Sequence, residues 1–481
     1  MVFSSISFLF YFLPLVLALY YVFSFSRPMQ NVWLLIASLI FYAWGEPIFV
    51  CILLVSVLVN YILGLLEQRW RDASPPKAKV VVVICCFVNL GILFVFKYLA
   101  FVISIINDLC GTSILKVPEI ALPIGISFYT FQALSYVIDI YRKKTDCQKN
   151  PLYVGLYISF FPQLIAGPIV RYNTISEQIK YRKSSLEQFT TGTTRFVVGL
   201  SKKVLLANNL AIVADTIFRL TQTTKEQYSV PVLMAWLGAV CYMLQIFFDF
   251  SAYSDMAIGL GQMFGFQFEE NFNYPYISKS VGEFWRRWHI SLGTWFKEYV
   301  YFPLGGSRTE NKDKMVRNTF IVWLLTGVWH GAYWTFIIWG VYNFAFIMIE
   351  RLIGFERREG NKILRHCYLV LVTLFGWVMF RADTLYELNE YYGNMFGLNN
   401  NAIYGEIVGM FIKEYAVVLV VAIVLCTPIV KVISKKVDDL NSIFLRNVCK
   451  VISAIGICGM FSYSVICMVK GGYNPFIYFN F

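Results

Sequence analysis

Charged side chains are scarce in this sequence. Of its 481 residues, only 15% are charged, while 58% are hydrophobic. A soluble globular domain carries about 25% charged residues, so this chain has too little charge to cover a water-facing surface. No long polar segment stands apart that could form a separate soluble domain. The scarcity argues against an ordinary soluble enzyme, and we treat residues 1–481 as one membrane domain.

Patterns typical of metal, disulfide and nucleotide sites are also missing. The eleven cysteines form no Cys-x-x-Cys pair, and most lie in apolar runs, where cysteine is a small packing residue. The Gly-Leu-Gly within residues 247–266 follows no predicted strand, so it is not a nucleotide fingerprint. We therefore expect no metal and no bound cofactor, and ATP is not indicated.

Long runs with little or no charge are abundant. A helix needs roughly 20 apolar residues to cross a hydrocarbon core about 30 Å thick, and in lipid a spanning segment of that length must be helical. We predict an all-α polytopic membrane protein with ten to twelve transmembrane helices. The first run lacks a basic n-region and a cleavage site, which favours a retained helix. The runs lie at residues 5–25, 28–45, 47–66, 80–107, 120–138, 227–248, 318–349, 366–380, 415–430 and 451–469.

The formal net charge of +12 reflects topology rather than nucleic-acid binding. Lysine and arginine gather in alternate loops, at residues 67–79, 139–149, 350–365 and 431–450. The positive-inside rule predicts that these loops are cytoplasmic. Counting outward from them predicts that both chain termini are extracytoplasmic, in a protein of the cell membrane.

His330, one of only three histidines in the chain, lies within the uncharged run 318–349. The run is too long for one perpendicular span, so it must tilt strongly or break, near Gly327 or Gly331. Either geometry puts the imidazole inside the membrane, where an ionisable residue normally faces a cavity or a partner. A neutral imidazole there could accept a proton from a hydroxyl. The alternative is a histidine that only packs between helices.

The second histidine, His289, lies in a segment rich in aromatic and basic residues, at residues 282–308. Such a helix suits the membrane interface or a re-entrant position. These residues alone favour a packing role for His289. A helical spacing there places one set of residues on a shared apolar face: Trp285, Trp288, His289, Leu292, Phe296 and Tyr299.

Two further segments carry unusual polar or helix-breaking residues. Asp249 and Asp255 stand in an otherwise uncharged stretch, where they could orient an imidazole or an acceptor hydroxyl, or pair with arginine as structural contacts. The residues favour the pairing with arginine. Residues 160–172 contain two prolines and a glycine in a nearly apolar run, which predicts a broken or re-entrant helix beside a cavity.

Several blocks taken together resemble the membrane-bound O-acyltransferase family, specifically its bacterial polysaccharide O-acetyltransferase branch. The resemblance implies a helical basin, with re-entrant and interfacial helices around a central tunnel. The family's catalytic histidine corresponds to His330 in GVWHGA, and its second histidine corresponds to His289 in WRRWHIS. The blocks are FSSISFLFYFLP, FYTFQALSYVIDIYR, FPQLIAGPIVR, FDFSAYSDMAIGLGQMFGF, FWRRWHISLGTWFKEYVYFPLGG and GVWHGAYWTFIIWG.

The resemblance also implies the reaction. Acetyl-CoA would be the cytoplasmic acyl donor, and His330 would be the general base. The acyl group would pass through the tunnel to an extracytoplasmic polysaccharide, or to a secreted or membrane-anchored partner that resembles a serine esterase. His289 would position donor or acceptor, or stabilise the charge of the transition state.

The chain ends at residues 475–481 with the sequence PFIYFNF. This FIYxxF ending resembles the tail of a short membrane peptide that accompanies the D-alanyl-transferring relatives, in which a tyrosine is thought to carry the acyl group. The resemblance predicts Tyr478 as an extracytoplasmic acyl carrier. An aromatic anchor at the membrane interface is the alternative.

Two other functions are compatible with parts of the sequence. Transfer of D-alanine to teichoic acid belongs to the same family, although the fused tail speaks against it. A transporter or flippase of glycan precursors could use His330 and Asp249 as proton relays. Transporters often contain inverted repeats, and no such repeat is evident here.

Overall fold

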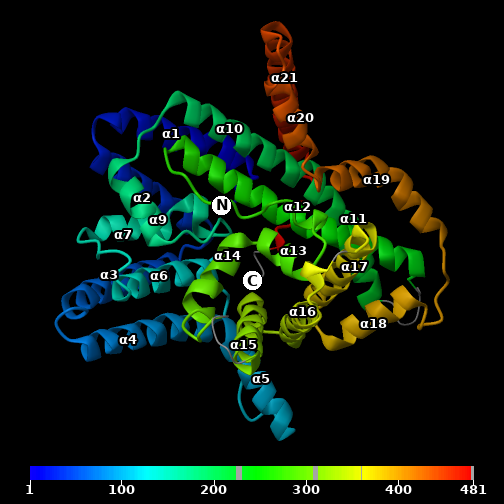
Figure 1. Ribbon diagram of the computed structural model, residues 1–481, viewed down its shortest axis with the longest axis horizontal. Helices are drawn as coiled ribbons and strands as arrows, with labels where there is room; N and C mark the ends of the chain where they lie inside the picture. Colours follow the sequence, from blue (N-terminus) through cyan, green and yellow to red (C-terminus); the bar gives the residue numbers. More distant parts are fainter. Residues whose placement is uncertain (224–229, 307–311, 359, 478–481) are drawn as a thin grey trace. The chain divides into compact units, whose positions relative to one another are not determined.

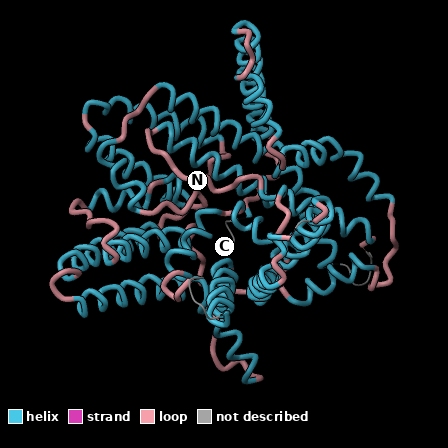
Figure 2. The backbone as a smooth tube through the Cα atoms, viewed as in Figure 1, coloured by secondary structure: helices cyan, strands magenta, loops and turns pink. Residues whose placement is uncertain are grey.

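The computed structural model describes residues 1–223, 230–306, 312–358 and 360–477. In this part of the chain every regular element is a helix and none is a strand (Figure 2). This confirms the predicted all-α polytopic fold. Nine helical segments of the described residues are long and apolar enough to cross a membrane: Phe8–Phe25, Val50–Trp70, Pro75–Cys110, Leu186–Thr221, Val232–Met263, Trp334–Leu352, Lys362–Arg381, Glu406–Leu425 and Ile443–Val469.

The nine segments, identified by their length and composition, are fewer than the ten to twelve transmembrane helices predicted from the sequence. Two of the predicted runs do form helices, namely α2 (Arg27–Gly45) and α6 (Ile126–Tyr141). α2 begins with polar residues, of which Gln30 and Asn31 are buried. α6 has 16 residues, a length of about 24 Å at 1.5 Å per residue. Both helices are therefore less suited to span a bilayer than the nine.

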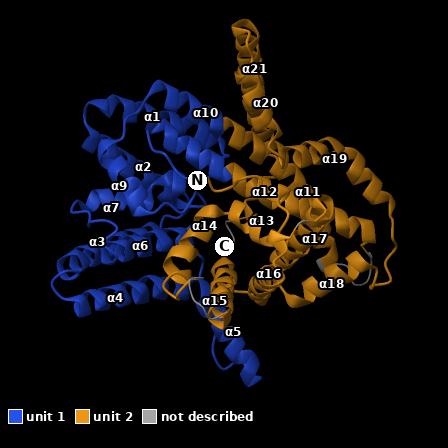
Figure 3. Ribbon diagram, in the orientation of Figure 1, with its two compact units in different colours: residues 1–196, 253–269, 478–481 blue, residues 197–252, 270–477 orange. Residues whose placement is uncertain are grey.

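The helices form two compact units (Figure 3). Among the described residues, unit 1 contains residues 1–196 and 253–269, and unit 2 contains residues 197–252 and 270–477. The long helix α12 (Val232–Met263) begins in unit 2 and ends in unit 1.

In unit 1, α3, α4 and α6 pack against one another, and α2 packs against α7 (Figure 1). The last turn of α10 belongs to unit 2. The elements in chain order are η1 (Phe8–Phe12), α1 (Leu13–Val22), η2 (Phe23–Phe25), α2, α3 (Val50–Trp70), α4 (Pro75–Leu93), η3 (Phe94–Tyr98), α5 (Leu99–Cys110), α6, α7 (Pro151–Ser159), α8 (Phe161–Leu164), α9 (Tyr172–Tyr181) and α10 (Leu186–Ser201).

The segment between α7 and α9 is broken, as the sequence predicted. α7 ends at Ser159, α8 is a single turn, and residues 165–171 are irregular yet mostly buried. Side chains satisfy backbone groups here: Tyr157 Oη donates to the carbonyl oxygen of Val170 at 3.0 Å, and Ser38 Oγ accepts from the amide of Phe161 at 3.1 Å. Irregular backbone at membrane depth is tolerated where protein groups bond to it in this way.

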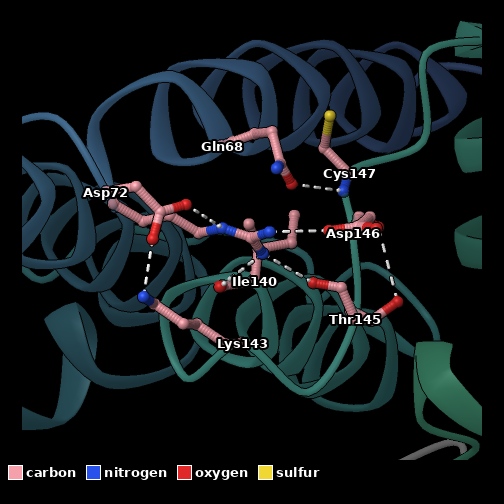
Figure 4. A network of polar contacts seen from close by, with 8 residues as sticks. Gln68, Asp72, Ile140, Lys143, Thr145, Asp146 and Cys147 are labelled. Carbon is pink, nitrogen blue, oxygen red and sulfur yellow. Dashed lines mark hydrogen bonds and ion pairs between the residues drawn. The ribbon is translucent and has the colours of Figure 1, made fainter.

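Two of the basic loops are joined by one arginine (Figure 4). Arg71 donates to the carbonyl oxygens of Ile140 and Thr145, at 3.3 and 3.1 Å, and pairs with Asp146 at 2.6 Å. It also pairs with Asp72, which is 2.5 Å from Lys143. The hydrogen bond from Lys143 lowers the pKa of the Asp72 carboxyl below its ordinary value. The network fastens the loop after α6 to the end of α3.

In unit 2, α15 packs against α16 and α16 packs against α17. α21 is little buried and extends away from these helices (Figure 1), as a helix surrounded by lipid would. The elements in chain order are η4 (Lys202–Ala207), α11 (Asn208–Thr223), α12, η5 (Pro275–Ile277), α13 (Val281–Arg287), α14 (Ile290–Phe296), η6 (Lys297–Tyr301), α15 (Lys312–His330), α16 (Trp334–Leu352), η7 (Phe355–Arg357), α17 (Lys362–Arg381), α18 (Leu385–Phe396), α19 (Glu406–Leu425), α20 (Ile429–Asp438) and α21 (Ile443–Val469).

Glycine lets α15 and α16 touch backbone to backbone. A Cβ atom added at Gly327 would lie 2.4 Å from the carbonyl oxygen of Phe336, and one added at Gly340 would lie 2.5 Å from that of Trp323. Small residues at such crossings let membrane helices approach closely. The uncharged run 318–349 therefore folds back on itself, with its break at residues 331–333. Of the two break positions predicted, Gly331 is the correct one.

We predict that Gly327→Val destabilises the protein, because its side chain must push the two backbones apart. Overpacking a tight contact costs about 1–3 kcal/mol, so the apparent melting temperature of the detergent-purified protein should fall. Gly456→Val is the matched control: Gly456 is also helical, and a Cβ there meets nothing within 4 Å. Equal melting temperatures for the two variants would contradict the predicted role of this crossing.

Candidate active site

His330 is the last residue of α15 and is 4% exposed. Its ring is surrounded by aromatic rings from three consecutive helices. Gly331 permits this arrangement, because a Cβ at that position would lie 2.3 Å from the ring of Phe336. Among the rings in contact with that of His330 are those of Trp329, Phe380, Trp339 and Phe336, with centroids at 4.9, 5.0, 5.2 and 6.5 Å.

His289 lies at a break between two short helices. α13 ends at Arg287, α14 begins at Ile290, and His289 has a φ of 45°, in the left-handed region. The single continuous helix assumed for this segment is therefore wrong. The sequence predicted correctly that His289 lies on an apolar face, since Trp288, His289 and Leu292 are all buried.

Asn271 holds the break in place. Its carbonyl oxygen accepts from the amide of Ile290 at 3.0 Å, and its Oδ1 accepts from the amide of Ser291 at 3.1 Å. Oδ1 also lies 3.2 Å from His289 Nδ1. In a continuous helix the amides of Ile290 and Ser291 could not donate to Asn271, because they would already donate to carbonyl oxygens within the helix. Burial lowers the pKa of His289 to about 3, so its imidazole is neutral near pH 7.

The structure brings the two histidines to the same indole. The ring centroid of Trp329 is 6.0 Å from that of His289 and 4.9 Å from that of His330. Phe250 of α12 adds an edge contact to His289, with ring centroids 4.7 Å apart. We call His289, His330, Trp329, Phe250 and Phe380 the histidine cluster. The cluster thus places two buried imidazoles against the same aromatic side chain, in surroundings that limit access to water.

The two aspartates of α12 differ in their partners. Asp255 pairs with Arg195 at 2.9 Å within unit 1, which agrees with the structural interpretation. Asp249 is 2.7 Å from the ammonium of Lys203 within unit 2. Its other oxygen, Oδ2, accepts from the amide of Ile477 at 2.9 Å. The third predicted site residue, Tyr478, lies outside the described residues.

Arginines line a cavity of about 290 Å³ in unit 2, beside the N-terminus of α13. Arg286, Arg351 and Arg357 face it together with Glu350 and Glu356. Glu350 accepts from the amides of Val281 and Gly282, at 2.6 and 3.0 Å, so its charge is already compensated. Burial acts to raise the pKa of Glu356, but hydrogen bonds from Ser280 and Arg286 lower it on balance. The lining holds three guanidinium and two carboxyl groups, of which Arg286 and Glu356 form an ion pair at 2.8 Å. The excess of one guanidinium group makes the cavity suitable for an anion.

Several of these residues carried no signal in the sequence. Asn271 and Lys203 are single polar residues without a recognisable motif, and only the fold shows what they touch. Trp329 stands beside His330 in the chain, but its second contact, to His289, depends on the break between α13 and α14. Across the ranges that the structure describes, no three histidine, cysteine, aspartate or glutamate side chains gather into a group that could hold a metal ion.

Comparisons with known proteins identify the family of this chain. The family profile described as MBOAT, membrane-bound O-acyltransferase family, matches residues 148–380, which include both histidines. The probable alginate O-acetylase AlgI of Pseudomonas putida is 38% identical over 497 aligned residues, covering 100% of both chains. The peptidoglycan O-acetyltransferase of Helicobacter pylori is 33% identical over 83% of this chain and 80% of that protein.

A D-alanine-transferring relative is more distant. The teichoic acid D-alanyltransferase of Bacillus subtilis is 33% identical, but over only 46% of this chain and 56% of that protein. The similarity to the Pseudomonas putida relative extends through the whole chain, including the membrane helices outside the central region. The chain therefore belongs to the membrane-bound O-acyltransferase family and is a multi-pass membrane O-acyltransferase.

Proposed function

We propose that this O-acyltransferase takes an acetyl group from acetyl-CoA in the cytoplasm and delivers it to an extracytoplasmic polysaccharide. The delivery is direct, or it passes through a secreted or membrane-anchored partner that resembles a serine esterase. The observation that carries the proposal is the pair of buried imidazoles that both contact the ring of Trp329. The relatives named above as alginate O-acetylase and peptidoglycan O-acetyltransferase support an envelope glycan as the acceptor.

His330 is the general base in this proposal. It removes the proton from the attacking hydroxyl as the oxygen bonds to the thioester carbon. When the carbon–sulfur bond breaks, the same proton passes to the departing sulfur, so the products are an ester and a free thiol. A positioned base of this kind contributes roughly 10²–10⁴-fold to the rate.

His289 is a positioning group rather than a second base. Its pKa of about 3 leaves it neutral, and Nδ1 is directed to Asn271 at 3.2 Å. Because Asn271 Oδ1 can only accept, Nδ1 carries the proton of the neutral ring and Nε2 is left as an acceptor. Nε2 can therefore accept a hydrogen bond from a hydroxyl or amide of the donor or acceptor and hold that group in place for the reaction.

The arginine-lined cavity supports a phosphate-bearing donor. Arg286, Arg351 and Arg357 offer planar donors that match phosphate oxygens. Arg357 also belongs to the basic loop 350–365, which the positive-inside rule puts in the cytoplasm. Coenzyme A carries phosphates and is made in the cytoplasm, so the cavity would receive it on the correct side. A tunnel from there to the outer face would let the acetyl group cross without the coenzyme.

Tyr478 is the acyl carrier in this proposal. A phenol has a pKa near 10 and is a weak nucleophile unless a base assists. With His330 as base, the phenol oxygen displaces the thiol of the donor and forms a phenyl ester. A hydroxyl of the acceptor then attacks that ester, and the phenol recovers its proton. Two steps suit a donor and an acceptor that remain on opposite sides of the membrane.

We predict that cells with the wild-type chain carry O-acetyl groups on an envelope polysaccharide that cells with His330→Ala lack. The variant removes the base and its ring contacts, but Phe380 still packs against Phe336 and Trp339, with ring centroids 4.9 and 5.2 Å apart, so it should still insert and purify. Mass spectrometry of isolated envelope glycans gives the measurement. If the variant keeps more than about a tenth of the wild-type acetylation, His330 is not the general base, because loss of such a base lowers the rate by roughly 10²-fold or more. D-alanine in place of acetate would refute the proposed acyl group.

We predict that His289→Ala lowers acetyl transfer, but less than His330→Ala does. The loss removes a positioning group while the base remains. Since the pKa of His289 is about 3, its protonation adds no step to the pH dependence of transfer between pH 5 and 9. Initial rates of transfer across that range provide the test. Wild-type rates in His289→Ala would assign this histidine to packing alone.

A further inference from the structure

The described chain ends in a short tail, residues 473–477, that is bonded to unit 2 along its length. Tyr473 donates its phenolic proton to Asp215 Oδ2 at 2.8 Å. Asn208 donates to the side-chain oxygen of Asn474 at 3.3 Å. The tail is therefore held by polar side chains of α11 from its first residues onward.

A buried ion pair holds the end of the tail. Lys203 of η4 and Asp249 of α12 are 2.7 Å apart, and their side chains are 4% and 1% exposed. Lys203 also donates to the carbonyl oxygen of Pro475, and Asp249 Oδ2 accepts from the amide of Ile477 at 2.9 Å. The ammonium lies 5.9 Å from the ring centroid of Phe476. Each ion of the pair thus binds one main-chain group of the tail.

Both attachments lie next to the histidine cluster. Asp249 is followed in α12 by Phe250, whose ring contacts that of His289 at 4.7 Å. Asp215, which binds Tyr473, also forms an ion pair with Arg381 at 3.0 Å. Phe380 directly precedes Arg381 in α17. The ring of Phe380 contacts that of His330 at 5.0 Å. One attachment, Asp249, is therefore adjacent in sequence to a ring of the cluster, and the other, Asp215, is connected to one through its ion pair with Arg381.

We propose that Lys203 and Asp249 form a clamp on the main chain of the tail and are positioning residues for acyl transfer. This inference rests on the carrier role proposed for Tyr478. The clamp fixes Ile477, the residue before Tyr478, through backbone atoms. Removing two charges from water is costly, and an apolar pair could join η4 to α12 equally well. The pair is ionic because the carbonyl oxygen of Pro475 needs a donor, which Lys203 supplies, and the amide of Ile477 needs an acceptor, which Asp249 supplies.

The clamp is tested with the double variant Lys203→Met/Asp249→Leu in the full-length protein. Replacing both ions with apolar side chains of similar size avoids a lone buried charge, so the variant should fold. Carboxypeptidase digestion, followed by intact-mass measurement, reports how far the C-terminus can be trimmed. We expect the described part of the tail to resist trimming in the wild type, and trimming of the variant to continue past Ile477 toward Lys470. We also expect kcat for acetyl transfer to fall by roughly 10²-fold, with KM for the donor unchanged, because the carrier is misplaced.

The matched control is Arg71→Met/Asp146→Leu. That ion pair also holds main-chain groups, the carbonyl oxygens of Ile140 and Thr145, but in a loop of unit 1. Its loss should lower the melting temperature without changing trimming or kcat. Lys203→Arg keeps the charge and the donors, so it should preserve slow trimming and most of the activity.

Tyr478→Phe separates the clamp from the carrier role. An inactive Tyr478→Phe variant with wild-type trimming, beside a rapidly trimmed and slow double variant, supports the clamp. If the double variant is trimmed like the wild type or transfers acetyl at the full rate, the clamp is refuted while the carrier role stands. Full activity in Tyr478→Phe refutes the carrier role, and with it the positioning function of the clamp.

Discussion

Backbone contact between α15 and α16 determines where the central histidine lies. Gly327 and Gly340 bring the two helices together, and the chain turns back at residues 331–333. His330 is therefore at the end of a helix instead of in the middle of a span, with rings of α15, α16 and α17 around it. A larger residue at either glycine would separate the helices and change this cage. The position of the proposed base thus depends on the absence of two side chains.

Two buried aspartates of unit 2 are paired with cationic side chains, and their partners explain the arrangement around the histidines. Asp215 is bound by Arg381 and Tyr473, and Asp249 is bound by Lys203 and the amide of Ile477. Burial of an unpaired ion is costly, so each pair fixes the elements that supply it. In unit 2 these pairs connect η4, α11, α12 and α17 to the C-terminal tail. The same bonds that neutralise the charges therefore hold the tail beside the cluster.

The sequence predicted the helical fold, a strong tilt or a break near Gly327 or Gly331, and the burial of both histidines, because uncharged runs and the scarcity of histidine are strong local signals. It did not predict the break at His289. That break depends on Asn271, a residue distant from any motif, which binds the backbone of α14. Lys203 was missed for a similar reason, since a lysine near the end of an apolar run resembles an interfacial residue until its partner is known. Asp249 was singled out, but as an orienting or structural carboxylate and not as a ligand of the tail.

The account is tested most directly by trapping the acyl-enzyme. The purified protein, incubated with acetyl-CoA and no acceptor, should yield a C-terminal peptide heavier by one acetyl group, with the modification on Tyr478. The same peptide from His330→Ala should be unmodified, because the phenol then lacks its base. An unmodified wild-type peptide, obtained under conditions in which added acceptor is acetylated, would contradict the account.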